Sequence, residues 1–460
     1  MDYNQKLIDL RRYLGVKPDK KGLTHNINKH APFFPFPTRA SERARFARGF
    51  DGVVGEFTRL VSNHSLKEKI EIEDIIKGIS DKVQMDIHDK PYFQRLMKLY
   101  LADNHSSMKV FHPHIFQYFQ RTEGDEGKGE AEIALLLRDI YINSNESIRS
   151  IFEKGNSDHV ISKLILDQLD YLVVKEKTNK YVGKLPQITD LFNEDISYLA
   201  KYPEYFTVNL SLFLSYYYFF YISQLSLKLS QKFIADSSKV NELFYMLDWE
   251  GPGKSRKSYT IGYNLIKDSL RNLLVQVNTL EHVNLLQGTH GLSYPELVDF
   301  YNGISVIEQT ELRNVLTNWI HEYRCLMELE QMKELPKKYD ELIISLYNSI
   351  EEVHTKLPTK QGTKSRYSLS LEQIGKKYFL KTRGSLGYML NIKQELLLLI
   401  TTVVVKDERK SLKSVFEGLE KRGLFFDRYS KEAIVELYDK LNLLDKKSDS
   451  GDAQYVKPIL

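Results

Sequence analysis

A phosphate-binding loop is the first chemistry that the sequence suggests. Residues Asp248 to Ser255 read DWEGPGKS and end in the Gly-Lys-Ser that closes such loops. The loop requires a glycine five residues before Gly253, but Asp248 stands there, and Pro252 has no backbone N–H to offer a phosphate. We therefore expect no functional ATP site at this position.

Basic side chains in and after this segment suggest a second chemistry, the neutralisation of DNA phosphates. The three cations concerned are Lys254, Arg256 and Lys257. A surface loop that carries them can contact phosphate without a nucleotide pocket. Arg383 stands beside Gly384 and Gly387, a pair typical of a tight turn with accessible backbone amides, so we add it to the predicted DNA contacts.

The strongest DNA-binding candidate is the arginine-rich segment Thr38 to Arg48. It reads as a short helix capped by Thr38 and ended by Gly49, and its arginines are Arg39, Arg43, Arg45 and Arg48. Arginines near aromatic side chains suit contacts with phosphates and bases. The alternative is that they are solvated or paired with carboxylates, because they are divided between two helix faces.

Other motifs predict structure more than catalysis. The segment Gly49 to Phe57 is rich in glycine but matches no nucleotide fingerprint, so it predicts a structural turn, and His112 and His114 predict a loop pair. The only cysteine, Cys325, lies in a helical pattern. We predict no catalytic residue, no metal site and no cofactor, although distant residues can still assemble a divergent nuclease or nucleotide-dependent site.

These candidates must be positioned by a large folded chain. Its 460 residues are 42% hydrophobic, which suffices for roughly two to four domains, and the formal net charge is only +4. One cysteine excludes a disulfide framework, so we expect a cytoplasmic protein. The residues from Val208 to Leu227 carry no charge, but their serines, tyrosines, Asn209 and Gln224 favour a helix buried in a protein core over a membrane span.

A proline-rich segment and two polar stretches divide the chain into three predicted domains. The segment Ala31 to Thr38 alternates proline with phenylalanine and predicts an extended strap. Polar stretches at 121–130 and 360–367 predict linkers. The predicted domains are a basic helical domain at 1–122, a central helical domain at 131–358 and a winged-helix-like domain at 385–460.

The C-terminal domain is the most regular part of the sequence. Three helices are predicted at 396–405, at 412–422 after a Ser411 cap, and at 431–441 after a Ser430 cap. Two short strand-like runs at 443–446 and 454–457 follow as a hairpin. Three helices and a hairpin form a winged helix, so the predicted fold class is mainly α, with several helical domains and a C-terminal winged helix.

The outward side chains of the third helix carry both signs of charge: Lys431, Glu432, Glu436, Asp439 and Lys440. The hairpin loop likewise sets Lys446 and Lys447 against Asp449 and Asp452. A DNA-reading face is consistently basic, so we favour a helix that docks a partner protein. DNA reading by this helix, as in a transcriptional regulator, is the alternative.

Five motifs of the sequence point together to one known family: FPFPTR at 34–39, GFDGVVGEF at 49–57, LDWEGPGKS at 247–255, LGY at 386–388 and SGDAQYVKP at 450–458. As a set, they resemble the G component, DptG or DndG, of bacterial DNA phosphorothioation-dependent restriction systems. The resemblance implies action with F and H partners against DNA that lacks phosphorothioate marks. It also implies that motor or nuclease activity belongs mainly to those partners. It assigns no catalytic residue.

Overall fold

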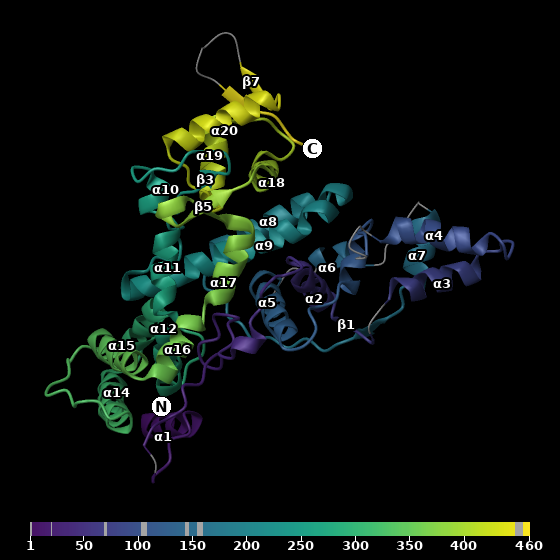
Figure 1. The fold of residues 1–460 in the computed structure, drawn as a ribbon. Helices are drawn as coiled ribbons and strands as arrows, with labels where there is room; N and C mark the ends of the chain where they lie inside the picture. The colour runs from purple at the N-terminus through teal and green to yellow at the C-terminus, as the bar shows by residue number, and fades with distance from the viewer. Residues whose placement is uncertain are drawn as a thin grey trace.

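The computed structural model describes residues 2–19, 21–68, 71–102, 108–142, 147–153, 160–446 and 454–460, and they are mainly helical (Figure 1). The helices of the first part are α1 (Tyr3–Tyr13), α2 (Asp51–Val61), α3 (Ile72–Lys82), α4 (Lys90–Leu101), α5 (Glu126–Tyr141), α6 (Ser147–Ile151) and α7 (Val160–Gln168). Those of the middle are α8 (Pro186–Leu199), α9 (Pro203–Gln231), α10 (Lys257–Thr260), α11 (Tyr263–Arg271), α12 (Leu273–Gln287), α13 (Tyr294–Gly303), α14 (Val306–Leu326), α15 (Tyr339–Lys356), α16 (Pro358–Arg366) and α17 (Leu369–Ile374). The last are α18 (Gln394–Val405), α19 (Leu412–Lys421) and α20 (Arg428–Lys440).

The strands are short and form three small sheets. In the first, β1 (His64–Leu66) pairs with β2 (Leu172–Val174). The second has the order β3-β5-β4, from β3 (Met246–Leu247), β5 (Tyr388–Ile392) and β4 (Leu380–Thr382). The third has the order β6-β8-β7, from β6 (Lys410–Ser411), β8 (Gln454–Val456) and β7 (Leu444–Lys446).

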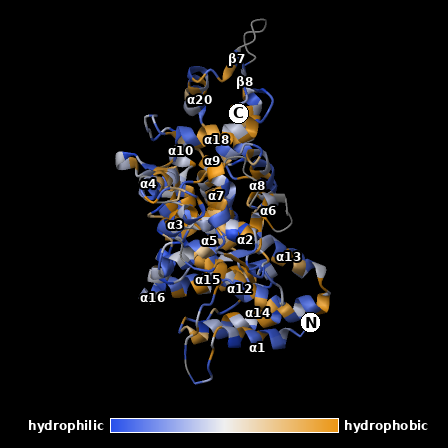
Figure 2. Cartoon of the chain, turned by 90° about the vertical axis from the view of Figure 1, so that its right-hand side faces the viewer, coloured by the Kyte–Doolittle hydropathy of each residue, from blue (hydrophilic) through white to orange (hydrophobic). Residues whose placement is uncertain are grey.

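Helix α9 is the centre of the protein. Every residue from Phe213 to Leu229 is buried, and Figure 2 shows hydrophobic residues along the helix. Its polar groups find partners: the Tyr217 hydroxyl donates to Asp195 at 2.5 Å, and the Gln224 amide donates to a backbone oxygen at 3.0 Å. The predicted buried helix is confirmed. Among the residues described, no helix is long and apolar enough to cross a membrane.

The proline-phenylalanine strap lies against the core, and Phe33, Phe34 and Phe36 are each at most 1% exposed. The predicted helix from Thr38 to Arg48 is wrong, since only the single 3₁₀ turn Ala40–Glu42 forms. Ala44 and Phe46 are both buried, two residues apart, and Phe46 has a φ of +57°. A continuous helix would place these two side chains on different faces, so tertiary burial overrides local helix propensity.

The glycine-rich segment after Gly49 was predicted as a turn, but it forms helix α2. A Cβ atom on Gly55 would lie 2.2 Å from the Phe119 backbone oxygen, and one on Gly52 would lie 2.4 Å from Glu130. The glycines therefore allow close packing of this helix against its neighbours, and no local turn is needed.

Both predicted linkers are also wrong, because each contains a helix. Helix α5 begins at Glu126, inside 121–130, and the Glu130 carboxylate accepts bonds from the Thr122 backbone N–H and hydroxyl at 2.7 Å each. Helix α16 occupies most of 360–367. Polar composition was misleading at 121–130, because polar groups there bond to one another. The main apolar core is one cluster in space, and its members, which lie between Tyr3 and Val456 in the sequence, come from all three predicted domain ranges.

A second, smaller apolar core lies beside the main one. It is built from α3, α4, α7 and the 3₁₀ helix Pro113–Tyr118, with Ile79, Met97 and Ile165 among its buried residues. These helices extend to one side in Figure 1. This part of the molecule contains none of the predicted DNA-binding or docking residues.

The C-terminal segment, residues 394–460, has the predicted three helices and paired strands. Helix α19 begins after Ser411, whose hydroxyl accepts from the Ser414 N–H at 3.2 Å, as predicted. The third helix begins at Arg428, three residues earlier than predicted, because Asp427 rather than Ser430 is its cap. Strands β7 and β8 pair antiparallel. The predicted loop residues Lys447, Asp449 and Asp452 lie outside the described residues.

A buried ion pair joins the C-terminal segment to the helical body. The Arg422 guanidinium donates to both carboxylate oxygens of Asp195, at 2.7 and 2.5 Å, and the two side chains are 6% and 0% exposed. Burial disfavours the charge, but the carboxylate outweighs it and raises the pKa of Arg422. Next to it, a Cβ on Gly423 would lie 2.3 Å from the Phe220 ring of α9. The segment is thus packed directly onto the central helix.

Candidate interaction site on helix α20

The start of helix α20 is held by a residue from a distant part of the chain. Asp427 caps the helix by accepting from the Ser430 N–H at 3.0 Å. The same carboxylate accepts two bonds from Arg256, at 2.6 and 2.8 Å, and the Arg256 guanidinium also binds Glu250 at 2.8 Å. Bidentate pairs of this kind fix direction as well as distance. The segment 250–256 is therefore clamped to the first turn of α20.

Electrostatics favours the charged forms of this clamp. Burial opposes the charge on Arg256, but its hydrogen bonds to Asp427 and Glu250 outweigh burial and raise the pKa of the guanidinium. Burial acts to raise the pKa of Asp427, yet the bonds from Arg256 lower it overall. The predicted role of Arg256 in DNA binding is wrong, because its guanidinium is 9% exposed and already bound to two carboxylates.

Arg383 also points into the protein. Its guanidinium donates to the backbone oxygens of Leu247 and Glu250, at 3.0 and 2.9 Å, and to the Asn391 side chain at 3.0 Å. Lys381 pairs with Asp248 at 2.9 Å on the same sheet. The donors of Arg383 are therefore used within the protein, where they hold the segment after β3 against β5, and this arrangement does not support the predicted DNA contact.

The clamp leaves three cations on the surface near the start of α20. Lys254 and Lys257 are exposed, and so is Arg428, whose side chain is 88% accessible. Tyr429 is 64% exposed, with the Arg256 guanidinium 5.2 Å from its ring centre. We call Lys254, Lys257 and Arg428 the basic edge. Sequence reasoning predicted the two lysines but missed Arg428, which becomes their neighbour only through the fold.

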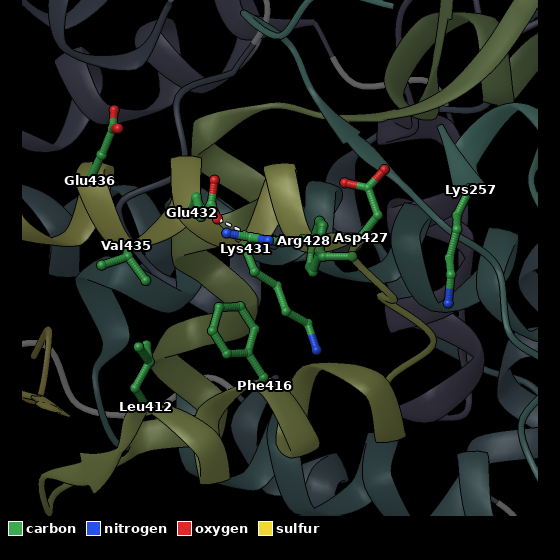
Figure 3. Close-up of a pocket in the computed structure, with 10 residues that line it drawn as sticks. Lys257, Leu412, Phe416, Asp427, Arg428, Lys431, Glu432, Val435 and Glu436 are labelled. Atoms are coloured by element: carbon green, nitrogen blue, oxygen red, sulfur yellow. Dashed lines mark hydrogen bonds and ion pairs between the residues drawn. The ribbon is translucent and has the colours of Figure 1, made fainter. Parts of the chain in front are cut away.

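A groove lies between α19 and α20, and Lys257 and Arg428 of the basic edge are among the residues that line it. Its volume is about 880 Å³, and its apolar lining comes from Leu412, Phe416, Phe426 and Val435. The Lys431 ammonium lies 5.0 Å from the Phe416 ring centre and pairs with Glu420 at 3.0 Å. Figure 3 shows Phe416 of α19 between Leu412 of the same helix and Lys431 of α20.

The predicted docking residues divide between this groove and the surface beyond it. Lys431, Glu432 and Glu436 line the groove, and Glu432 also pairs with Arg428 at 2.8 Å. Asp439 and Lys440 are exposed nearer the end of the helix and do not line it. The apolar lining was not part of the prediction, because Leu412 and Phe416 come from α19.

The N-terminal arginines belong to residues 39–48, which precede α2 in a different part of the fold from α20 (Figure 1). Arg39, Arg45 and Arg48 are exposed. Arg43 is half-buried, and burial is the main cause that lowers its pKa, with smaller contributions from Arg45 and Arg366. Arg366, at the end of α16, therefore joins this basic group, although no local pattern connects it with residues 39–48.

Two buried histidines, His282 and His354, and the half-buried His25 form a polar cluster that sequence reasoning missed. The rings of His25 and His282 stack with centres 6.2 Å apart, and His354 lies 5.1 Å from His25. Burial lowers the pKa of His282 to about 3 and that of His354 to about 4. Their bonds run to Tyr323 and Trp319, so the cluster is neutral and internal. Within the described part of the chain, no group of three histidine, cysteine or acidic residues is arranged to hold a metal ion.

The strand and helix that flank the Gly-Lys-Ser segment differ from those that flank a phosphate loop. Strand β3 before it has two residues and helix α10 after it has four. Residues 251–255 are irregular between them. A phosphate loop joins a strand to a long helix whose N-terminus faces the phosphate, so the local structure supports the expectation of no ATP site.

No protein-family model matches the chain, and a search of curated proteins finds no similar sequence.

Proposed function

We propose that this protein is a noncatalytic DNA-binding and assembly subunit of a phosphorothioation-dependent restriction complex, a defence system that acts on unmodified DNA. The sequence resemblance to the G component supports the type of system. The clamp between Arg256 and Asp427 supports the role and carries the proposal, because it places the basic edge and the groove side by side on one rigid support. Such a support can hold DNA and a protein at a fixed separation.

We further propose that the C-terminal segment is a winged helix. Its elements follow the order α18, β6, α19, α20, β7 and β8, and the three strands form one antiparallel sheet. That order supports the interpretation, with α20 as the third helix and β7–β8 as the wing. In this role the segment is an integral part of the body, since Arg422 and Asp195 fix it to α9 and α8.

DNA and partner contacts divide between different surfaces in this proposal. DNA phosphates meet Lys254 and the exposed N-terminal arginines Arg39, Arg45 and Arg48. Partner protein meets the groove and the mixed charges of α20, where Glu432 and Glu436 would repel phosphate. The F and H proteins are the proposed partners, and they supply the motor and nuclease activities.

Reconstitution with purified F and H proteins tests the proposal. The three proteins should assemble on unmodified DNA, and the isolated chain should bind that DNA without cutting it in Mg²⁺ or Mn²⁺. Point variants are required, because deletion of residues 391–460 would expose the α9 surface that Gly423 and Arg422 cover. The noncatalytic role would be contradicted if the isolated chain cut DNA in the presence of a divalent metal ion and a point variant that still folds had lost this activity.

A further inference from the structure

The groove between α19 and α20 is apolar along its floor and charged at its ends. Phe416 and Phe426 are 9% and 3% exposed, while Leu412 and Val435 are half-buried. A partner side chain that covered these last two residues would remove apolar surface from water, which is the main favourable term in association. The floor therefore suits one or two apolar side chains of a partner.

The rim has a basic end and an acidic end, and Lys431 and Glu432 between them are paired within the protein, to Glu420 and Arg428. Lys257 and Arg428 lie at the end where α20 begins, and Glu436 lies two turns further along the helix. The pair between Arg428 and Glu432 is a surface pair, with side chains 88% and 56% exposed, so exchanging its partners costs little. A complementary segment needs an acidic side chain at the first end and a basic one at the second.

The distance between the two charged ends sets the length of that segment. Glu436 lies eight positions after Arg428 on the helix, a distance of about 12 Å at the helical rise of ~1.5 Å per residue. About two turns of a second helix cover the same distance. Helices that lie in such grooves present apolar anchors at intervals of three or four residues, which matches a floor enclosed by two charged ends.

We propose that this groove binds an amphipathic helix of a partner protein, with an acidic side chain, one or two apolar side chains and then a basic side chain within about two turns. The inference rests on the proposed function, because it identifies the element of the partner that docks on α20. Duplex DNA suits this site poorly, since the carboxylates of Asp427, Glu432 and Glu436 line it beside its three cations, so no net positive charge faces a phosphate.

Site-specific photocrosslinking tests the occupant. A photoreactive amino acid replaces Val435 in the full chain, and the same amino acid replaces Val208, 81% exposed on α9, as the matched control. In the complex with F, H and DNA, the Val435 probe should form an adduct with a helical segment of one partner that carries the acidic, apolar and basic order. The Val208 probe should not label that segment. Mass spectrometry of the adduct identifies the segment.

Charge and polarity variants provide the affinity test. Val435→Asp should weaken partner binding by about tenfold or more, and Glu436→Lys by a smaller factor, because anchors in apolar pockets contribute most of the binding energy. Glu417→Lys is the matched control, since Glu417 is exposed on α19 but does not line the groove. Equal thermal unfolding midpoints for the variants show that each is folded.

The outcomes separate the inference from the proposed function. Assembly of the complex with no adduct at Val435, with an adduct to DNA, or with an adduct to a segment lacking the charge order, overturns the groove assignment alone. Failure of the unmodified chain to assemble with F and H overturns both. Loss of binding in Glu417→Lys equal to that in Glu436→Lys also overturns the groove assignment, because it shows a general effect of charge.

Discussion

The arginines of residues 39–48 and the arginines that hold the C-terminal segment lie in opposite environments. Arg39, Arg45 and Arg48 extend into water, where a phosphate can reach them. Arg256 and Arg422 are 9% and 6% exposed and are paired with carboxylates. An arginine is charged in both places, so its burial and its partner decide whether it binds DNA or joins two parts of the fold. A count of basic residues does not make that distinction.

The largest expected effect comes from breaking the most buried pair. Arg422→Ala should lower the free energy of unfolding by about 3–5 kcal/mol, because it leaves the Asp195 carboxylate buried without its cation. Urea denaturation measures the change. Arg428→Ala, at a position 88% exposed, is the control and should change the free energy by less than about 0.5 kcal/mol. A small loss for Arg422→Ala would mean that water reaches the pair.

The buried histidines extend the comparison, because a histidine can lose its charge whereas an arginine cannot. His282 has a folded pKa of about 3, below the usual 6.5. The unfolded chain therefore binds a proton first as the pH falls, so stability is fully present above pH 6.5 and decreases below it, by ~1.4 kcal/mol per unit. His282→Gln should remove about 2 kcal/mol of the loss between pH 6.5 and 5.

Urea unfolding at pH 7, 6.5, 6, 5.5 and 5 checks this pH dependence. His88→Gln is the control, because His88 is exposed and belongs to no buried cluster. Parallel stability curves for the unmodified chain and His282→Gln would show that another group causes the loss at acidic pH.

A smaller effect is expected at the exposed arginines, where folding is not involved. Arg45→Ala with Arg48→Ala should leave stability unchanged and should lower the slope of log affinity against log salt by about 0.9 for each lost phosphate contact. Fluorescence anisotropy on duplex DNA over a salt series measures the slope. Arg271→Ala, 69% exposed on α11, serves as control. An unchanged slope in the double variant would leave these arginines without a DNA role.

The smallest expected effect is at Lys254, which is exposed and is not part of the clamp. Lys254→Ala should leave the ATPase activity of the reconstituted complex within about twofold, because the segment lacks the first glycine of a phosphate loop. Its affinity for DNA should fall slightly. A collapse of ATP hydrolysis in an assembled complex would identify Gly251 to Ser255 as a nucleotide site.

Local signals explain which elements the sequence could predict. The ends and faces of α19 follow from Ser411 and from apolar residues at helical spacing, and the helix forms as expected. The segment 38–48 carries an equally clear local signal, but burial of Ala44 and Phe46 overrides it. A local pattern therefore predicts the element correctly where the residues that it places on the apolar face are also the residues buried in the core.

The candidate site depended on contacts that no local pattern contains. Arg256 and Asp427 are 171 residues apart in the chain, and Arg422 and Asp195 are 227 apart. Nothing near Arg256 distinguishes it from Lys254 or Lys257, so all three were predicted to contact phosphate. The mixed charges of α20 were readable from sequence, but the groove required the position of α19 relative to α20.

The packing of Gly423 and Arg422 on helix α9 has a consequence for synthesis on the ribosome. The Tyr216 hydroxyl of α9 donates to the Arg422 backbone oxygen at 2.5 Å, and strand β3 pairs in parallel with β5. The ribosome therefore synthesises the aromatic helix α9 about two hundred residues before Arg422, which covers part of its surface. Until then, that part of α9 is exposed apolar surface, the kind that chaperones bind, and a prematurely terminated chain would leave it accessible to proteases.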